Sequence, residues 1–193
     1  MTSNEVQAVF RDCGAVLEGH FVLSSGLHSP TFLQKARVFM HADATARLCA
    51  ALAAKVRASG LGPIDYVVGP AVGGIIPAYE MGRQLALPAV WVERESGRFR
   101  LRRFQIERGA RCLVVEDIVT TGLSVRETVA CLTDLGVEVA GTAVIVDRSG
   151  GEADVGSAPL IALAEWTIPT YAADALPPEL AALPTTRPGS RAL

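Results

Sequence analysis

Four short apolar runs alternate with helical or charged segments through the middle of the sequence. They are 64–70 (IDYVVGP), 88–92 (PAVWV), 112–115 (CLVV) and 141–148 (GTAVIVDR). Their apolar residues do not alternate with polar ones, which indicates strands that are covered on both faces. Strands of this kind separated by helices are typical of a parallel sheet between helical layers. We therefore expect an α/β fold.

The spacing of apolar residues predicts helices over 4–18, 43–59, 73–87 and 124–136. Asp43 is a candidate N-cap for the second helix, and Val125, Val129, Leu132 and Leu135 should form one buried face of the last. One domain, 1–193, is expected, with an N-terminal segment at 1–40, an α/β core at 41–150 and an edge strand plus peripheral tail at 151–193. The N-terminal segment should hold one or two short strands, and 160–166 the edge strand.

The bulk properties narrow the class of protein. Half of the 193 residues are hydrophobic and the net charge is −2, which argues against extensive disorder and against nucleic-acid binding driven by bulk charge. No run approaches the roughly 18 apolar residues of a membrane span, and the start lacks the pattern of a signal peptide. The four cysteines lack metal-ligand spacing. We expect a cytoplasmic protein with no membrane or nucleic-acid partner.

The stretch 112–128, CLVVEDIVTTGLSVRET, carries the chemistry. Glu116 and Asp117 follow an apolar strand, and a Thr-Thr-Gly-Leu-Ser turn then leads into a helix. Ligands in such sheets gather beyond the carboxyl ends of strands, and the first amides of a helix attract phosphate. The two acids suit sugar hydroxyls or a magnesium ion, so the stretch predicts a ribose 5-phosphate site. The alternative is that Ser124 caps the helix and the acids are merely solvated.

The segment VVEDIVTTGLS resembles the phosphoribosyl-pyrophosphate (PRPP) signature of the type I phosphoribosyltransferases. The resemblance implies their α/β fold, a mostly parallel twisted sheet flanked by helices with a small N-terminal hood. It also implies that the loop binds the 5-phosphate and the acids bind the ribose hydroxyls. The implied PRPP-binding residues here are Glu116, Asp117, Ile118, Val119, Thr120, Thr121, Gly122, Leu123 and Ser124. A Walker A loop and a dinucleotide-binding glycine fingerprint are both missing.

A second glycine loop lies one strand earlier, in VVGPAVGGIIPAYE. It resembles the pyrophosphate loop of the same family, which places Val72 and Gly73 against the leaving group. Many members carry a lysine where Gly73 stands, so backbone amides or an arginine from elsewhere must serve here. A plain helix start, with glycines for close packing, is an equally good interpretation of this loop taken alone.

The segment 93–111 holds seven arginines and neither lysine nor histidine. In the family it is a mobile loop that closes over the substrates, usually across a dimer interface. The resemblance therefore implies a homodimer with this loop near the partner's active site, and Arg94 as a ligand of pyrophosphate. Arginine cannot donate a proton near neutral pH, so the source of any catalytic proton is unassigned. The alternative is a solvated hairpin with a charged face.

The N-terminal stretch EGHFVLSSGLHSPTFLQKARV resembles that of the orotate phosphoribosyltransferases, which forms a hood over the base. The implied orotate-binding residues are Thr120, Arg148, Ser24, Phe32 and Leu33. Ser24 stands where many relatives have a lysine, and Lys35 is a nearby cation that could compensate. His20 and His28 are more simply interpreted as surface or turn histidines. The alternative for Arg148 is an exposed salt bridge at the end of a strand.

Together these resemblances imply an orotate phosphoribosyltransferase, which would transfer phosphoribosyl from PRPP to orotate in pyrimidine biosynthesis. The expected catalytic residues are Asp117, Glu116 and Arg94, with Mg²⁺ held mainly through PRPP rather than by direct protein ligands. A purine phosphoribosyltransferase is the alternative enzyme. A non-enzymatic PRPP-sensing regulator, with an RNA-binding surface on the arginine-rich segment, is the alternative from another class.

Overall fold

A six-stranded sheet forms the centre of the molecule in the computed structural model, which describes residues 1–23 and 25–188. The strand order is β5-β4-β3-β6-β7-β8. The strands are β3 (Tyr66–Pro70), β4 (Ala89–Glu95), β5 (Arg98–Arg100), β6 (Arg111–Val119), β7 (Glu138–Asp147) and β8 (Leu160–Glu165). All pair in parallel except β5, which forms an antiparallel hairpin with β4. The predicted parallel sheet is confirmed, with 160–165 as its edge strand.

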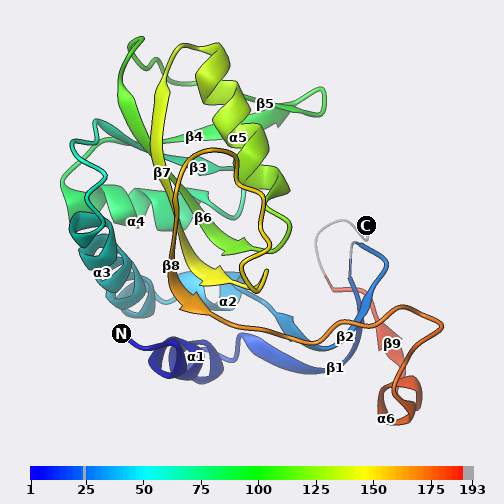
Figure 1. The fold of residues 1–193 in the computed structure, drawn as a ribbon. Coiled ribbons are helices and arrows are strands. Elements are labelled where there is room, and N and C mark those ends of the chain that lie inside the picture. Colours follow the sequence, from blue (N-terminus) through cyan, green and yellow to red (C-terminus); the bar gives the residue numbers. More distant parts are fainter. Residues whose placement is uncertain (24, 189–193) are drawn as a thin grey trace.

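Helices cover both faces of this sheet (Figure 1). On one face lie α3 (Ala42–Ala58) and α4 (Ile75–Leu85), with α1 (Ser3–Asp12) against β8, and on the other lies α5 (Leu123–Asp134). Successive residues of β6 pack into different cores: Leu113 and Val115 on the α3–α4 side, Cys112 and Val114 on the α5 side. This double burial explains why the strands are continuously apolar in sequence.

A second sheet of three strands forms a hood that projects away from the core (Figure 1). Strands β1 (Val16–Val22) and β2 (His28–Leu33) form an antiparallel hairpin, and β9 (Thr185–Thr186) pairs in parallel with β1. The short helices α2 (Ala36–Phe39) and α6 (Pro178–Ala181) flank the hood segments in sequence. The prediction of a peripheral C-terminal tail is therefore wrong, because the tail supplies the third strand of the hood.

Two histidines join the tail to the hood. His20 is buried, and its Nε2 lies 2.6 Å from Nδ1 of His28. Its Nδ1 lies 3.2 Å from the carbonyl oxygen of Leu183, and the backbones of His28 and Tyr171 exchange two hydrogen bonds of 2.8 Å. The interpretation of His20 as a surface or turn histidine is wrong, because long-range pairing with the tail buries it.

Several predicted boundaries differ from the observed ones. The helix expected over 4–18 ends at Asp12, because Gly14 turns the chain with a φ of 61° and 16–18 then enter β1. The N-cap of α3 is His41, so Asp43 lies in the first turn instead. The N-cap of α5 is Gly122, so Ser124 does not cap it, and Leu135 at its other end is exposed. Within the described residues, no helix is long and apolar enough to cross a membrane.

Candidate active site

The predicted site residues gather where three neighbouring parallel strands end. The end of β3 leads into residues 71–74, the end of β6 into 120–124, and the end of β7 into Arg148. Because β6 lies between β3 and β7, these segments share one edge of the sheet, and the arrowheads of β6 and β7 point toward the hood segments (Figure 1). Ligands of open α/β sheets bind at this edge.

The two acids lie inside β6 rather than beyond it, because the strand continues to Val119. Asp117 is 0% exposed and Glu116 is also buried. The Oδ1 atom of Asp117 accepts hydrogen bonds from Lys35 Nζ at 2.6 Å and from the backbone N–H of Ile118 at 2.5 Å. Its Oδ2 atom is buried and has no hydrogen-bond partner among the described residues. The interpretation of these acids as solvated strand-end residues is wrong.

Burial also changes the proton affinity of Glu116. Desolvation, followed by the negative charge of Asp117, raises the pKa of Glu116 to about 8, while the ammonium of Lys35 opposes the rise. The carboxyl group keeps one short-range donor, the backbone N–H of Asp117 at 3.1 Å from Oε1. The ionised form of Glu116 is therefore disfavoured, and any additional hydrogen-bond donor or cation would stabilise it.

The turn that follows β6 presents backbone amides at the start of α5. Gly122 is the N-cap and has a φ of 80°, and no side chain caps this helix. A Cβ at this position would lie 2.1 Å from the carbonyl oxygen of Asp154, so a side chain has no space. The side chains of Thr120, Thr121 and Leu123 are exposed. Such a helix start suits a phosphate, and the contact of this turn with the 5-phosphate stays a prediction.

The predicted pyrophosphate loop packs directly against the end of β6. A Cβ on Gly73 would lie 2.2 Å from Oδ2 of Asp117, and one on Gly74 would lie 2.6 Å from Cδ of Pro70. These glycines therefore allow close backbone contact, which was one of the two interpretations of the loop. The side chain of Val72 is 83% exposed. The structure thus brings Gly73 and Asp117 together.

The end of β7 carries a cation whose donor is unsatisfied. The backbone N–H of Arg148 donates to the carbonyl oxygen of Val119 at 2.9 Å, which sets it beside the 120–124 turn. Its Nε is buried without a partner among the described residues, and desolvation lowers the pKa of its guanidinium. Asp147 instead accepts from the backbone N–H and hydroxyl of Ser149. The alternative of an exposed strand-end salt bridge is wrong.

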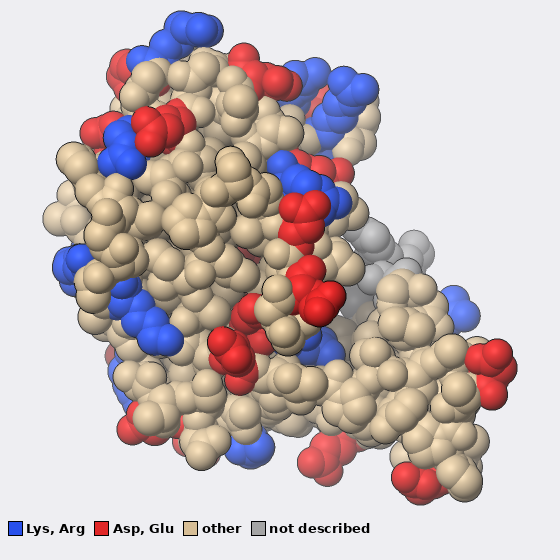
Figure 2. Space-filling view, in the orientation of Figure 1, with Lys and Arg blue, Asp and Glu red and all other residues tan. Residues whose placement is uncertain are grey.

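The arginine-rich segment begins as the β4–β5 hairpin, not as an irregular loop. Arg94 pairs with Glu127 of α5, donates to the carbonyl oxygen of Gly97 at 2.8 Å and lies 4.3 Å from the ring centroid of Phe99. Figure 2 shows basic side chains gathered at the tip of this hairpin, with acidic ones nearby. Arg94 is thus anchored to the helix that follows the phosphate turn, and its contact with pyrophosphate stays a prediction.

The predicted base-binding residues of the hood behave differently from one another. Phe32 is half-buried and its ring lies 5.8 Å from that of Phe21. Leu33 is 4% exposed and belongs to the core on the α3–α4 side. Its predicted contact with the base is wrong for this conformation, because alternation along β2 turns Leu33 to the opposite face from Phe32. Ser24 lies outside the described residues.

Lys35 has a closer role at the site than the sequence pattern indicates. The pattern marks it only as a nearby cation, whereas its ammonium contacts the buried Asp117. The two residues are 82 positions apart, and no local pattern links them. A usable signal was the scarcity of lysine, since the chain has only Lys35 and Lys55.

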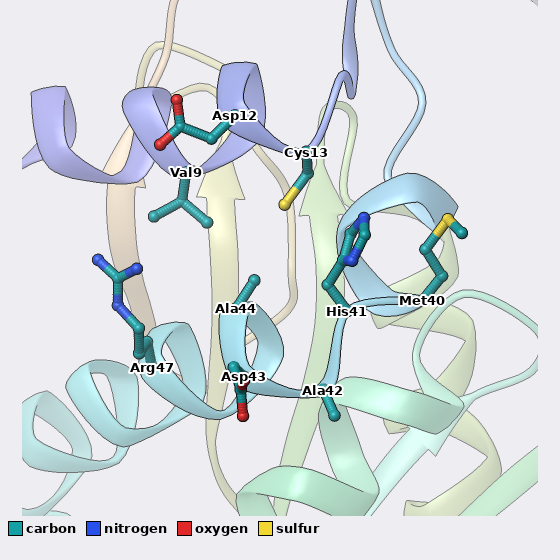
Figure 3. A pocket seen from close by; sticks show the side chains of 9 residues that line it. All are labelled: Val9, Asp12, Cys13, Met40, His41, Ala42, Asp43, Ala44 and Arg47. Carbon is teal, nitrogen blue, oxygen red and sulfur yellow. The ribbon is translucent and has the colours of Figure 1, made fainter.

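A separate surface cleft lies between α1 and the start of α3 (Figure 3). Its volume is about 470 Å³, and Asp12, Cys13, His41 and Arg47 are among its lining residues. Figure 3 shows these charged and polar side chains around an open depression rather than converging on one point. None of the predicted site residues lines this cleft.

Comparisons with known proteins agree with the geometry at the sheet edge. The family model described as phosphoribosyl transferase domain matches residues 39–162. The orotate phosphoribosyltransferases of Brucella ovis and Brucella suis are each 66% identical over 191 residues, covering 99% of both chains. Among solved structures, orotate phosphoribosyltransferase from Aeropyrum pernix is 28% identical with a TM-score of 0.69, covering 83% of this chain and 93% of that one.

A solved structure with lower sequence identity shares the same fold. An adenine phosphoribosyltransferase structure superposes with a TM-score of 0.67 at 16% identity, covering 82% of this chain and 98% of that one. At this identity the likeness concerns the fold alone. The family match and the full-length identity together show that the chain belongs to the phosphoribosyltransferase family and, within it, to the orotate phosphoribosyltransferases.

Proposed function

We propose that this chain transfers the 5-phosphoribosyl group of PRPP to orotate, giving orotidine 5′-monophosphate and diphosphate in pyrimidine biosynthesis. Full-length identity to orotate phosphoribosyltransferases supports the reaction. The single structural observation that carries the choice of base is Arg148. It provides a partly buried guanidinium with an unsatisfied Nε beside the phosphate turn, which suits the carboxylate of orotate.

The donor would bind along β6 and its turn. Backbone amides of residues 120–124 would hold the 5-phosphate, while Glu116 and Asp117 accept hydrogen bonds from the ribose hydroxyls. The unpaired Oδ2 of Asp117 and the strained carboxylate of Glu116 support this assignment, because both gain from added donors. Val72 and Gly73 would face the diphosphate from the adjacent loop.

Orotate enters with its carboxylate ionised, and the ring nitrogen that attacks still carries a proton. The bond between the anomeric carbon and the diphosphate oxygen breaks as that nitrogen bonds to the carbon. The proton of the nitrogen passes to the departing diphosphate or to water, so no strong base of the protein is required. Catalysis then consists mainly of positioning the two reactants and of stabilising charge as it develops. The pairing of acids at β6 with a cation at β7 supports such a site, since each matches a different substrate.

Mg²⁺ fits this site as a companion of the donor rather than as a resident ion. Among the described residues, no cluster of three or more His, Cys, Asp or Glu side chains could hold a metal, and Asp117 already uses Oδ1 for Lys35. The ion would therefore be held mainly through PRPP, with Glu116 and Asp117 nearby. When bound, it neutralises charge on the diphosphate.

The protein is proposed to act in the cytoplasm as a homodimer. Its four cysteines are free thiols, which suits a reducing compartment. Val72, Ile76 and Tyr79 expose apolar side chains around the start of α4, and Tyr79 is 67% exposed. Together with the adjacent hairpin they make a surface suited to a second copy. The segment 93–111 would then lie near the partner's active site.

The deciding experiment is turnover by the purified protein with PRPP, Mg²⁺ and orotate, followed by loss of orotate absorbance. We expect turnover with orotate and none with adenine or hypoxanthine. Turnover with a purine but not with orotate would overturn the assignment of the base. If no base supports turnover, the protein is not the proposed enzyme, and a PRPP-sensing role becomes the better explanation.

A further inference from the structure

Lys35, Gly73 and Asp117 meet although they come from three separate segments. Lys35 follows β2 of the hood, Gly73 belongs to the loop after β3, and Asp117 lies in β6. Lys35 Nζ is 2.6 Å from Asp117 Oδ1, and the position of a Cβ on Gly73 would be 3.2 Å from that nitrogen. The hood, the predicted pyrophosphate loop and the predicted ribose-binding strand are therefore joined at one ion pair.

The glycine makes room for this ion pair. A Cβ at position 73 would lie 2.2 Å from Oδ2 and 3.1 Å from Cγ of Asp117. Any other residue there would therefore push the buried carboxylate, which has little space to retreat because its side chain is 0% exposed. The absence of a side chain at 73 and the presence of Lys35 are thus two parts of one arrangement.

Lys35 is the only side chain among the described residues that donates a hydrogen bond to this carboxylate. Asp117 follows another buried acid, Glu116, and its Oδ1 otherwise receives only the backbone N–H of Ile118. Two adjacent buried carboxylates repel each other, and an unpaired buried charge is costly. The side chain of Lys35 is 41% exposed, so the lysine is only partly desolvated while it neutralises a fully buried partner.

We infer that Lys35 is a positioning residue of the transfer reaction, holding the Asp117 carboxylate oriented toward the donor ribose in the space that Gly73 leaves open. This inference rests on the proposed function. Lys35 acts from the hood, which is also predicted to cover the base, so it ties the geometry of the sugar site to the placement of the hood.

The first test replaces Lys35 with methionine, which keeps the length of the side chain and removes its charge. We expect kcat/KM for PRPP to fall by roughly 10- to 100-fold, because a buried carboxylate loses its charged partner. Lys55→Met is the matched control. Lys55 donates to the carbonyl oxygens of Ala162 and Leu163, away from the site, so its kcat/KM should stay within about threefold of wild type.

The dependence of kcat/KM on pH distinguishes a positioning role of Lys35 from a role in which Lys35 only holds the hood against the sheet. The charges that act on Glu116 among the described residues are Asp117, which raises its pKa, and Lys35, which lowers it. Lys35→Met should therefore move the ascending limb of kcat/KM against pH to higher pH, and Lys35→Arg should restore the wild-type limb. If Lys35 only holds the hood against the sheet, Lys35→Met should lower the midpoint of thermal unfolding and leave the ascending limb of kcat/KM against pH unchanged.

Gly73→Ala provides an independent variant with Lys35 intact. It should lower kcat/KM for PRPP by at least about tenfold, because the methyl group displaces Asp117. The inference is overturned if wild type turns over orotate while Lys35→Met stays within threefold of it, or if the loss occurs without a shift of the pH limb. An inactive wild type would instead contradict the proposed function, so the two failures are distinguishable.

Discussion

The carboxyl ends of β6 and β7 lie side by side but differ in which buried charged groups have a partner. Val119 of β6 is in register with Asp147 of β7. The β6 end concentrates two buried acids and compensates one of them with Lys35. At the β7 end, Asp147 is satisfied by its own turn, while Arg148 keeps a buried donor without a partner among the described residues.

This difference matches the substrate group that each strand end is proposed to recognise. Ribose hydroxyls donate hydrogen bonds, so acceptors that are buried and held in place suit them. Orotate carries a carboxylate, so a partly desolvated guanidinium suits it, because charge pairs are stronger where water is excluded. In the sequence the two ends look alike, as Glu-Asp and as Asp-Arg after an apolar run. Only the tertiary contacts show which group is satisfied and which is not.

The largest expected effect comes from neutralising the β6 end. Asp117→Asn should lower kcat by about 100-fold or more, because the oriented negative charge at the ribose is lost. Asp117 is also buried and ion-paired, so its replacement affects stability as well as turnover. The fold should persist because asparagine has the same shape, with a loss of unfolding free energy of roughly 1–3 kcal/mol.

Steady-state kinetics and chemical denaturation of the same preparations check this prediction. Asp134→Asn, at an exposed position at the end of α5, is the matched control and should leave both measurements close to wild type. A kcat within a few fold of wild type for Asp117→Asn would show that the β6 acid does not act on the donor.

Arg148→Ala should weaken binding of orotate at the β7 end and leave binding of PRPP nearly unchanged. Removal of a charge-assisted pair with the base should raise KM for orotate by roughly 10- to 100-fold, while KM for PRPP changes less than about threefold. The measurement is initial rate against each substrate in turn. Arg83→Ala, which removes an exposed arginine paired with Glu80, is the control. An equal rise in KM for both substrates would show that Arg148 does not bind the base.

The five parallel strands of the large sheet were predictable and the third strand of the hood was not, for physical reasons. The core strands are buried on both faces, so their apolar runs are visible in any stretch of sequence. Strand β9 has only Thr185 and Thr186, both exposed, and pairs with β1 across more than 160 positions. No local pattern encodes such a contact. The same holds for Lys35 and Asp117, whose ion pair exists only once the hood meets the sheet.

Replacing Glu116 should have a smaller effect, on thermal stability, that tests whether a buried charge at the β6 end destabilises the folded protein. Its pKa is about 8 in the folded protein against 4.5 as the reference value, so the folded state binds more protons between these pH values. Stability from this group is therefore present below about pH 4.5 and lost as pH rises toward 8. Without added ligands, Glu116→Gln should gain thermal stability relative to wild type across that window, by a few degrees.

Scanning calorimetry of wild type and Glu116→Gln at several pH values between 5 and 9 measures this difference. Cysteine and tyrosine groups titrate in both proteins, so their contributions cancel in the comparison. A difference in midpoint that stays constant across pH would mean that Glu116 is not strained, and the two strand ends would then differ less than their contacts indicate.

The smallest effect concerns the hood, which is proposed to cover the base. His20 is buried, contacts His28 through Nε2 and reaches the carbonyl oxygen of Leu183 through Nδ1. His20→Ala should therefore loosen β9 and lower the unfolding free energy by about 1 kcal/mol. His41→Ala, at an exposed position, is the control. His20→Ala acts on the β9 side of the hood and leaves Lys35 in place, so KM for PRPP should stay near wild type and KM for orotate should rise a few fold. A larger effect on PRPP would mean that the tail contacts of His20 also hold Lys35 in position.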